Sequence, residues 1–291
     1  MRRIYSLMAA LAVASPAMAQ NLNLGSASDG APVPIQITAD QGISWSQKDN
    51  TVTASGNSKA VRGDTTVTAD QLIAHYKPKT TGAAPQSNAD NMLSPGGSQI
   101  TQLDAIGHVH IYTATDNAWG DHAVYSIGQQ LLVLTGKDLK LTTPKDTVTA
   151  RDSISYYTGD RKAIARGNAL ITTIDGRSVS ADVIIGYFSA PAARGAASQS
   201  STASTESLEK VDAIGHVVIT TPTDKATGDK AVYMPGTGEA RLGGNVQITH
   251  AGNHLAGSDA LVNMKTGTAT LLASPGGRVS GVILPNSGKA K

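Results

Sequence analysis

DAIGHVHIYTATDNAWGDHAVY, residues 104–125, and DAIGHVVITTPTDKATGDKAVY, residues 212–233, are two copies of one stretch of sequence. The copies are identical at 16 of 22 positions and lie at a constant offset of 108 residues. Self-similarity at a fixed period is the signature of a repeat architecture. The fold class is therefore decided by the repeat rather than by any single motif.

A shorter period runs inside each copy. Glycines begin strand-like runs in which apolar or small residues follow two and four places later, as Val109 and Ile111 follow Gly107. That spacing puts both residues on one face of a strand. The glycines are Gly56, Gly107, Gly136, Gly167, Gly215 and Gly244. Gly136 is followed instead by Leu139 and Leu141, one place out of phase, which predicts a β-bulge or a shifted strand start there.

An aspartate, usually preceded by a small residue, marks the region between these glycines. It recurs at Asp40, Asp70, Asp121, Asp152, Asp182, Asp229 and Asp259. The apolar run that follows usually reaches an aromatic residue, namely Trp45, Tyr76, Tyr125, Tyr156, Tyr187 or Tyr233, with Met264 in that place in the last full unit. Because it recurs in every unit, we expect the aspartate to be structural and to hold turn amides through its side chain.

Two stretches without any period interrupt the series. Residues 79–98 and 190–207 are rich in Gly, Ala, Ser, Pro and Asn, and they lengthen the Asp-to-Asp spacing from about 30 to 51 and 47. Such segments bury too little apolar surface to offset the cost of ordering, which predicts flexible insertions. The expected organisation is a signal peptide at 1–19, one repetitive β domain at 33–285 that contains both insertions, and a tail at 286–291.

Each unit of about 30 residues contains two strand passes and cannot close a core alone, so neighbouring units must stack. The composition agrees, because β-branched residues alternate with small polar ones and the chain has a single Phe. We therefore expect an all-β fold, an elongated antiparallel β-jellyroll or solenoid that is open at both ends.

The first residues predict export. Arg2 and Arg3 precede the short apolar run Leu7–Val13, and Ala17-Met18-Ala19 completes an Ala-x-Ala pattern that predicts cleavage before Gln20. Without Arg2 and Arg3 the mature chain has 22 basic and 22 acidic residues, a balance that argues against nucleic acid as a partner. The chain has no cysteine, which excludes disulfides, thiolate catalysis and a cysteine-linked lipid anchor.

Several motifs resemble those of the LptA/OstA-like (organic solvent tolerance-like) family, which contains periplasmic lipopolysaccharide-transport proteins. The motifs are ITADQGISWSQKDNTVTASGNSKAVRGDTTVTADQLIAHY at 37–76, GNALI at 167–171 with Ala181-Asp182, and GNVQI at 244–248 with Asp259. The likeness runs from about Ile35 to Leu284. It implies a folded-over antiparallel sheet whose apolar interior shelters the acyl chains of lipid A, with no catalytic residue and no cofactor. It also implies a periplasmic location and end-to-end stacking. The implied partners are lipopolysaccharide, an LptC-like inner-membrane protein, an LptD-like outer-membrane translocon and further copies of the chain.

Candidate lipid-binding residues follow from the strand period. We expect the following to face the groove: Ile73, Val109, Ile111, Val124, Ile171, Ile185, Val217, Ile219, Val232, Val246, Ile248 and Val262. The alternative is that the same residues simply fill the hydrophobic core. For the end strands we expect pairing with partners through Ile35 and Ile37 on one side and through Ala269 and Leu271 on the other.

Other functions could use some of the same residues. His108 and His110 have a spacing that metal sites use, but the second copy replaces His110 by Val218, which favours a surface pair and no metal. Lys59, Arg62, Lys77 and Lys79 could meet lipid phosphates, although scattered surface charge is the default. A β-helical adhesin and a polysaccharide-acting β-helix enzyme are the alternative classes. The enzyme would need a carboxylate pair that breaks the period, and the sequence shows none.

Overall fold

The computed structural model describes residues 35–78, 98–189, 208–250, 253–263, 268–273 and 278–282. Every regular element in these ranges is a strand. The strands are β1 (Gln36–Thr38), β2 (Gly42–Ser46), β3 (Thr51–Arg62), β4 (Thr65–Pro78), β5 (Ser98–Tyr112), β6 (Asn117–Ser126), β7 (Leu131–Thr135), β8 (Leu139–Thr142), β9 (Asp146–Ala150), β10 (Ser153–Tyr157), β11 (Lys162–Thr173), β12 (Ser178–Phe188), β13 (Leu208–Thr220), β14 (Asp224–Met234), β15 (Glu239–His250), β16 (Asn253–Asn263), β17 (Thr268–Leu272) and β18 (Ser280–Val282). The all-β prediction is confirmed. The expected signal peptide and both insertions, apart from Ser98 at the start of β5, lie outside the described residues.

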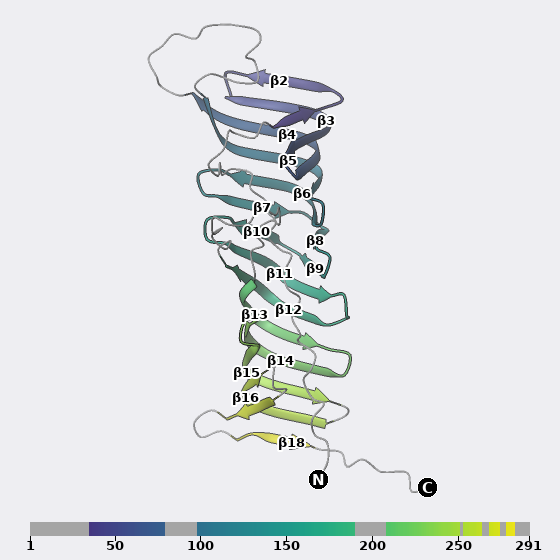
Figure 1. Ribbon diagram of the computed structural model, residues 1–291, viewed down its shortest axis with the longest axis vertical. Coiled ribbons are helices and arrows are strands. Elements are labelled where there is room, and N and C mark those ends of the chain that lie inside the picture. Colours follow the sequence, from purple (N-terminus) through teal and green to yellow (C-terminus); the bar gives the residue numbers. More distant parts are fainter. Residues whose placement is uncertain are drawn as a thin grey trace, which may run out of the picture.

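All strand pairs are antiparallel, and most strands pair with the strands next to them in sequence. β3 to β6 form one such run and β11 to β16 form another. The strands lie across the long axis of an elongated molecule, from β2 at one end to β18 at the other (Figure 1). The expected ladder of antiparallel units is therefore observed.

A β-bulge interrupts each long odd-numbered strand. In β13 it consists of Gly215 and His216, which both have positive φ, 78° and 47°. The register with β12 shifts by one residue there, so three residues of β13 oppose two of β12. The same pair of positive φ values occurs at Gly56–Asn57, Gly107–His108, Gly167–Asn168 and Gly244–Asn245. Five of the six repeated glycines thus lie inside long strands, which corrects the expectation that they begin strands.

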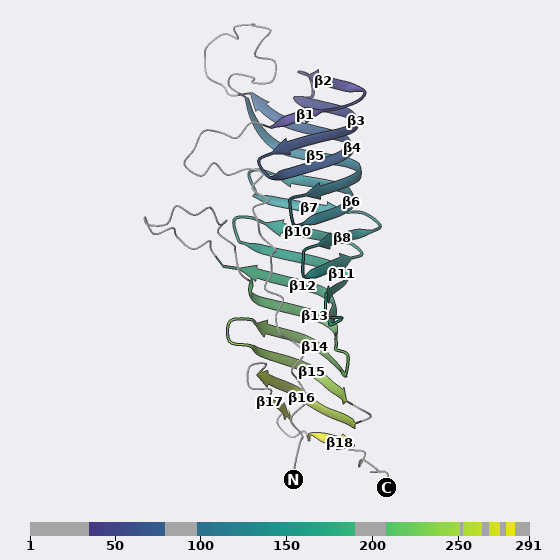
Figure 2. The ribbon, with the colours of Figure 1, turned by 45° about the vertical axis from the view of Figure 1, so that its right-hand side comes forward.

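The bulges divide the ribbon of strands lengthwise into two arms. The first arm contains the segments that precede the bulges, with the strand parts paired to them: 51–55, 98–106, 162–166, 208–214 and 239–243. The second arm contains the segments that follow the bulges: 58–62, 109–112, 169–173, 217–220 and 246–250. Residues of both arms line the same cavities, so the ribbon is folded over along the line of bulges. Figure 2 shows the folded ribbon from the side.

In the middle of the molecule the long strands are split into short ones. β6 pairs with β7 in the first arm and with β8 in the second arm, and β11 pairs with β10 and β9 in the same way. Gly136 lies in the break between β7 and β8 with φ of 150°. The predicted shift of the strand start after Gly136 is therefore observed.

Five of the seven aspartate markers lie opposite a bulge: Asp40, Asp70, Asp152, Asp182 and Asp229. Asp182 Oδ2 lies 2.8 Å from Nδ1 of His216, and Asp229 Oδ2 accepts a hydrogen bond of 3.0 Å from Nδ2 of Asn245. Asp70 meets His108, and Asp40 meets Asn57, in the same way. These aspartates therefore bind the side chains of the bulge residues, whereas they were expected to bind turn amides. Asp121 matches the expectation in one respect, since it accepts a bond of 2.9 Å from the backbone N–H of Lys137.

The marker Asp259 is out of step with the others. The register shift between β15 and β16 places Gly257 and Asp259 on either side of Ser258, as Gly228 and Lys230 flank Asp229 in the preceding unit. Ser258 therefore occupies the aspartate position of the last unit. Met264, the expected counterpart of the aromatic residue, lies outside the described residues.

Candidate functional site

The C-terminal cavity is an apolar space of about 230 Å³ between the two arms, bounded by strands from β8 to β16. From the first arm it is lined by residues such as Val211, Ala213 and Ala231, and from the second arm by residues such as Ile171 and Ile219. An apolar cavity of about 150 Å³ in another protein stays dry and binds benzene. A space of this size and lining therefore suits hydrocarbon.

The N-terminal cavity has an equivalent lining and a volume of about 110 Å³. Its first-arm residues include Ala54, Leu103 and Ala105, and its second-arm residues include Val67 and Ile111. The small size of many inward side chains explains both cavities, because alanines at such positions leave the space between the arms partly empty. Ala54, Ala105 and Ala213 are 2–4% exposed.

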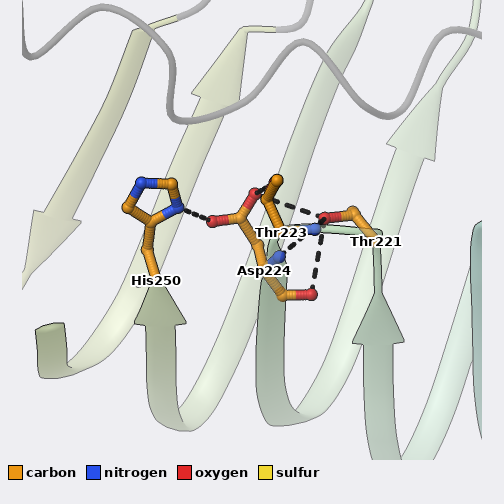
Figure 3. Close-up of polar contacts among 4 residues, drawn as sticks. All are labelled: Thr221, Thr223, Asp224 and His250. Carbon is orange, nitrogen blue, oxygen red and sulfur yellow. Dashed lines mark hydrogen bonds and ion pairs between the residues drawn. The ribbon is translucent and has the colours of Figure 1, made fainter. Parts of the chain in front are cut away.

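Polar hairpins form the rim of the second arm. In the β13–β14 hairpin the backbone N–H of Asp224 donates to Thr221 Oγ1 at 2.9 Å, and Thr223 Oγ1 donates to Asp224 Oδ2 at 2.6 Å. The other carboxylate oxygen of Asp224 contacts Nδ1 of His250 on β15 (Figure 3). Thr221 and Asp224 both line the C-terminal cavity. Polar groups that are already paired thus border the apolar space.

The same Thr-x-x-Asp arrangement occurs in two other hairpins. Asp116 N–H donates to Thr113 Oγ1 at 3.1 Å, and Asp146 N–H donates to Thr143 Oγ1 at 3.0 Å. Burial raises the pKa of both carboxyl groups, Asp116 and Asp146, above the usual value of 3.8. Burial thus favours the protonated form of these two carboxyl groups more than in an exposed aspartate.

Arginines lie at both cavities. Arg62 lines the N-terminal cavity, and Arg177 and Arg241 line the C-terminal cavity. The Arg177 side chain is 12% exposed and pairs with Asp175, and this pairing lowers the pKa of the Asp175 carboxyl. Burial raises the pKa of Tyr125 and Tyr233 above 10, partly opposed by the charge of Arg62 at Tyr125 and of Arg177 at Tyr233. Arg62 and Arg177 thus each lie close enough to one tyrosine of a cavity to act on it electrostatically.

The twelve expected groove residues fall into three groups. Seven line a cavity: Ile73, Ile111, Ile171, Ile219, Val232, Ile248 and Val262. Val109, Val217 and Val246 follow the bulges directly and are 0–1% exposed, so they fill the core beside the cavities. A charged substitution at Val217 would therefore disturb the fold itself. Ile219 is a better position than Val217 for a charged substitution that tests lipid binding.

Val124 and Ile185 form the third group, and the structure corrects their expected orientation. Their strand neighbours Ala123, Tyr125 and Ile184 are the buried ones, so Val124 and Ile185 point to the opposite face. The expected phase was three places after the aspartate, whereas on these two strands the buried residues lie two places after it, at Ala123 and Ile184. Val262 lies inward because the marker of its unit is Ser258.

The expected partner edges are the outermost described strands. Ile35 and Ile37 line the N-terminal cavity, and Ile37 pairs with Ala60 of β3. On the other side Ala269 pairs with Val262, and Leu271 with Ala260, both of β16. Within the described residues β1 and β2 pair only with β3, and β17 and β18 pair only with β16. Both ends of the described sheet thus have a strand edge.

The two histidines considered for a metal site or a surface pair lie in different surroundings. His108 is exposed at its bulge beside Asp70, whereas His110 stacks between Tyr112 and Trp119 with ring centroids 4.7 and 4.9 Å away. No group of three or more potential metal-binding side chains occurs in the part of the chain that the structure describes. Lys59 and Lys77 are exposed, and Lys79 lies outside the described residues. Of the four cations considered for lipid phosphates, only Arg62 lines a cavity.

Comparisons with known proteins give a family match, a sequence relative and a solved structure. Residues 36–162 and 190–268 match the family model described as LptA/(LptD N-terminal domain) LPS transport protein. An uncharacterized protein of Rhizobium meliloti, R00383, is 26% identical over 171 residues, which are 58% of this chain and 83% of that protein. Among solved structures, LptH, the LptA-homologous periplasmic component of the lipopolysaccharide transport device of Pseudomonas aeruginosa, matches 58% of this chain and 95% of its own. That match has 13% identity and a TM-score of 0.26. No helix among the described residues is long and apolar enough to cross a membrane.

Proposed function

The chain belongs to the LptA/(LptD N-terminal domain) family of lipopolysaccharide transport proteins, and on that premise we propose that it is a periplasmic carrier that moves lipopolysaccharide from the inner to the outer membrane. The acyl chains of lipid A lie between the two arms, and the sugars remain outside. The family is one of transport proteins, so the protein carries out no chemistry on its cargo. The adhesin and polysaccharide-enzyme alternatives have no support in the family match.

The observation that carries this proposal is the C-terminal cavity. Its walls come from both arms and are almost entirely aliphatic, with polar groups at the rim hairpins. Transfer of one methylene group from water into such a space contributes about 0.8 kcal/mol. A chain of about a dozen methylenes would thus gain on the order of 10 kcal/mol before the cost of association is subtracted.

The experiment compares two isoleucines of the same strand. Ile219 lines the C-terminal cavity, whereas Ile214 is 49% exposed on the outer face of β13. Ile219→Asp should reduce the capture of lipopolysaccharide by at least tenfold, because a carboxylate in the apolar space opposes acyl chains. Ile214→Asp should leave capture unchanged. Equal capture by wild type and Ile219→Asp, with both proteins folded, would refute the proposed binding mode.

Assembly is the second part of the proposal. The strand edges at β1–β2 and β17–β18 carry exposed apolar side chains, among them Ile43 at 46% and Val282 at 62%. Strand addition at such an edge pairs free backbone groups and would keep the space between the arms continuous across the joint. The N-terminal edge would dock an LptC-like protein of the inner membrane. The C-terminal edge would dock an LptD-like translocon of the outer membrane or another copy of the chain, head to tail.

A further inference from the structure

The two cavities are copies of one another. Residues at an offset of 108 line them in equal places, as shown by Ala105 and Ala213, Ile111 and Ile219, and Tyr125 and Tyr233. The strand pairing agrees, because Ala105 pairs with Ala123 as Ala213 pairs with Ala231. No residue lines both cavities. The duplication seen in the sequence therefore duplicated a complete cavity.

An aromatic pair marks the same place in each copy. Trp45 and Tyr76 meet edge to face with ring centroids 6.3 Å apart and planes at 66°. Tyr156 and Phe188 repeat this contact at 6.3 Å and 70°. The first pair stands at the β2 end of the N-terminal cavity. The second stands in the middle of the molecule, where Phe188 lines the C-terminal cavity.

A wall of large side chains separates the cavities at this second pair. Leu134 and Leu139 are 3% and 2% exposed, pack in one cluster with Tyr125 and Leu132, and line neither cavity. Leu132 lines the N-terminal cavity, whereas Leu141 lines the C-terminal one. The cross-section between β6 and β10 is thus filled by leucines and by Tyr156, which packs against the same cluster.

The wall exists because this unit has larger side chains than its counterpart. Leu132 pairs with Tyr125 and with Tyr156, and the corresponding Ala240 pairs with Tyr233 and with Val262. Leucine and tyrosine in the middle unit thus become alanine and valine in the last one. Ala240 and Val262 line the C-terminal cavity. The same positions that close the space in the middle leave it open towards the C-terminal end.

We infer that the chain has two separate acyl-chain sites, one in each cavity, which fill independently because the leucine wall lies between them. The inference rests on the proposed function and adds to it the number and independence of the sites. Hydrocarbon that passes along the molecule must cross the wall, so lipid moves between two discrete positions within one chain.

The test uses one cavity-filling substitution for each site. Ala231 lines the C-terminal cavity and Ala74 lines the N-terminal cavity, and both are partly buried at inward positions. Binding of the fluorescent fatty acid cis-parinaric acid to the whole chain is titrated for wild type, Ala231→Phe, Ala74→Phe and the double variant. Wild type should bind two molecules per chain. Each single variant should bind half as much probe as wild type at saturation, and the affinity of the site that stays open should be within twofold of wild type. The double variant should bind at least tenfold less probe than wild type.

Each single variant is the control for the other. If one substitution abolishes all binding, or if wild type binds one molecule per chain, the cavities form a single site and the inference is overturned. Where Ala231→Phe fails to fold, Ile219→Phe fills the same cavity and carries the same comparison. Capture of lipopolysaccharide is measured in parallel. If neither cis-parinaric acid nor lipopolysaccharide binds, the proposed function itself is contradicted. If both bind but the two cavities behave as one site, only the separation into two sites is contradicted.

Discussion

Nδ1 of His216 lies 2.8 Å from Oδ2 of Asp182, across the bulge at which the register of β13 with β12 shifts. The equivalent contact in the first copy, between His108 and Asp70, has the same length. The carboxylate also fills the space beside the bulge glycine, because a Cβ atom on Gly215 would lie 2.1 Å from Asp182 Oδ2. These bulges mark the line along which the sheet folds, so they determine whether an interior exists at all.

Gly215→Ala should destabilise the protein by more than strain alone. The left-handed conformation costs an alanine about 1–2 kcal/mol, and the contact with Asp182 adds to this cost. Gly176, with φ of 82° and nothing near its Cβ position, isolates the cost of strain, and Gly236 has neither feature. Midpoints of urea denaturation should fall most for Gly215→Ala, less for Gly176→Ala and little for Gly236→Ala. Equal effects at all three positions would contradict the role of the bulge.

The hydrogen bond that His216 donates to Asp182 raises the pKa of His216 above its usual value of 6.5, with the negative charge of Asp182 adding to the shift. The stabilisation is therefore present below 6.5 and is lost as the pH rises through the raised pKa. Both groups are exposed, so the effect on stability is small and the titration itself is the useful measurement. NMR titration should show a lower His216 pKa in Asp182→Asn than in wild type. An unchanged value would mean that the contact does not form in solution.

Leu139→Ala should test the leucine wall through stability. Leu139 is 2% exposed, and truncation of such a leucine removes about 2–5 kcal/mol of folding free energy, because the cavity left behind adds to the lost transfer term. Ile174, which is 84% exposed, is the matched control, and Ile174→Ala should change the midpoint of denaturation by little. A small effect at Leu139 would show that the middle of the molecule is loosely packed and that no wall exists.

The strand edge at β17 can be tested with proline. Neighbouring residues of an edge strand direct their N–H groups alternately towards the sheet and away from it. The double variant Ala269→Pro, Leu271→Pro is compared with the single variant Thr270→Pro. One of these two variants therefore removes N–H groups that point away from the sheet, and the other breaks the β16–β17 ladder. The outward variant should abolish head-to-tail assembly in light scattering without lowering stability. Assembly that survives both variants would exclude edge pairing as its mechanism.

Much of this architecture was predictable because it repeats. The 108-residue duplication and the two-residue strand period gave the ladder of antiparallel strands, and the motifs after Gly167 and Gly244 gave the family. The inward phase after the aspartate was wrong by one residue at Val124 and Ile185, because the alternation of faces is interrupted opposite each bulge, as on β12, where the buried residues Ala181 and Ile184 are three places apart. The Gly-Asn and Gly-His pairs were the signal for the bulges, since Asn and His tolerate positive φ better than most residues.

The division of the interior was missed for a different reason. The spacing of Leu139 and Leu141 after Gly136 predicts only a β-bulge or a shifted strand start. Only the pairing of Leu132 with both Tyr125 and Tyr156 shows that large side chains meet there from three neighbouring strands. Side-chain volume summed across strands far apart in sequence is a tertiary property, and periodicity within one strand does not contain it.

Site-specific photocrosslinking to lipopolysaccharide tests the central claim most directly, because the duplication provides matched pairs on both faces. Ile111 and Ile219 line the two cavities, whereas Ile106 and Ile214 occupy the outer face of the same strands at 40% and 49% exposure. A photoreactive residue at Ile111 or Ile219 should form lipopolysaccharide adducts, and one at Ile106 or Ile214 should form at least tenfold fewer. Adducts of equal yield on both faces, or adducts at Ile106 and Ile214 alone, would show that the lipid does not lie between the arms.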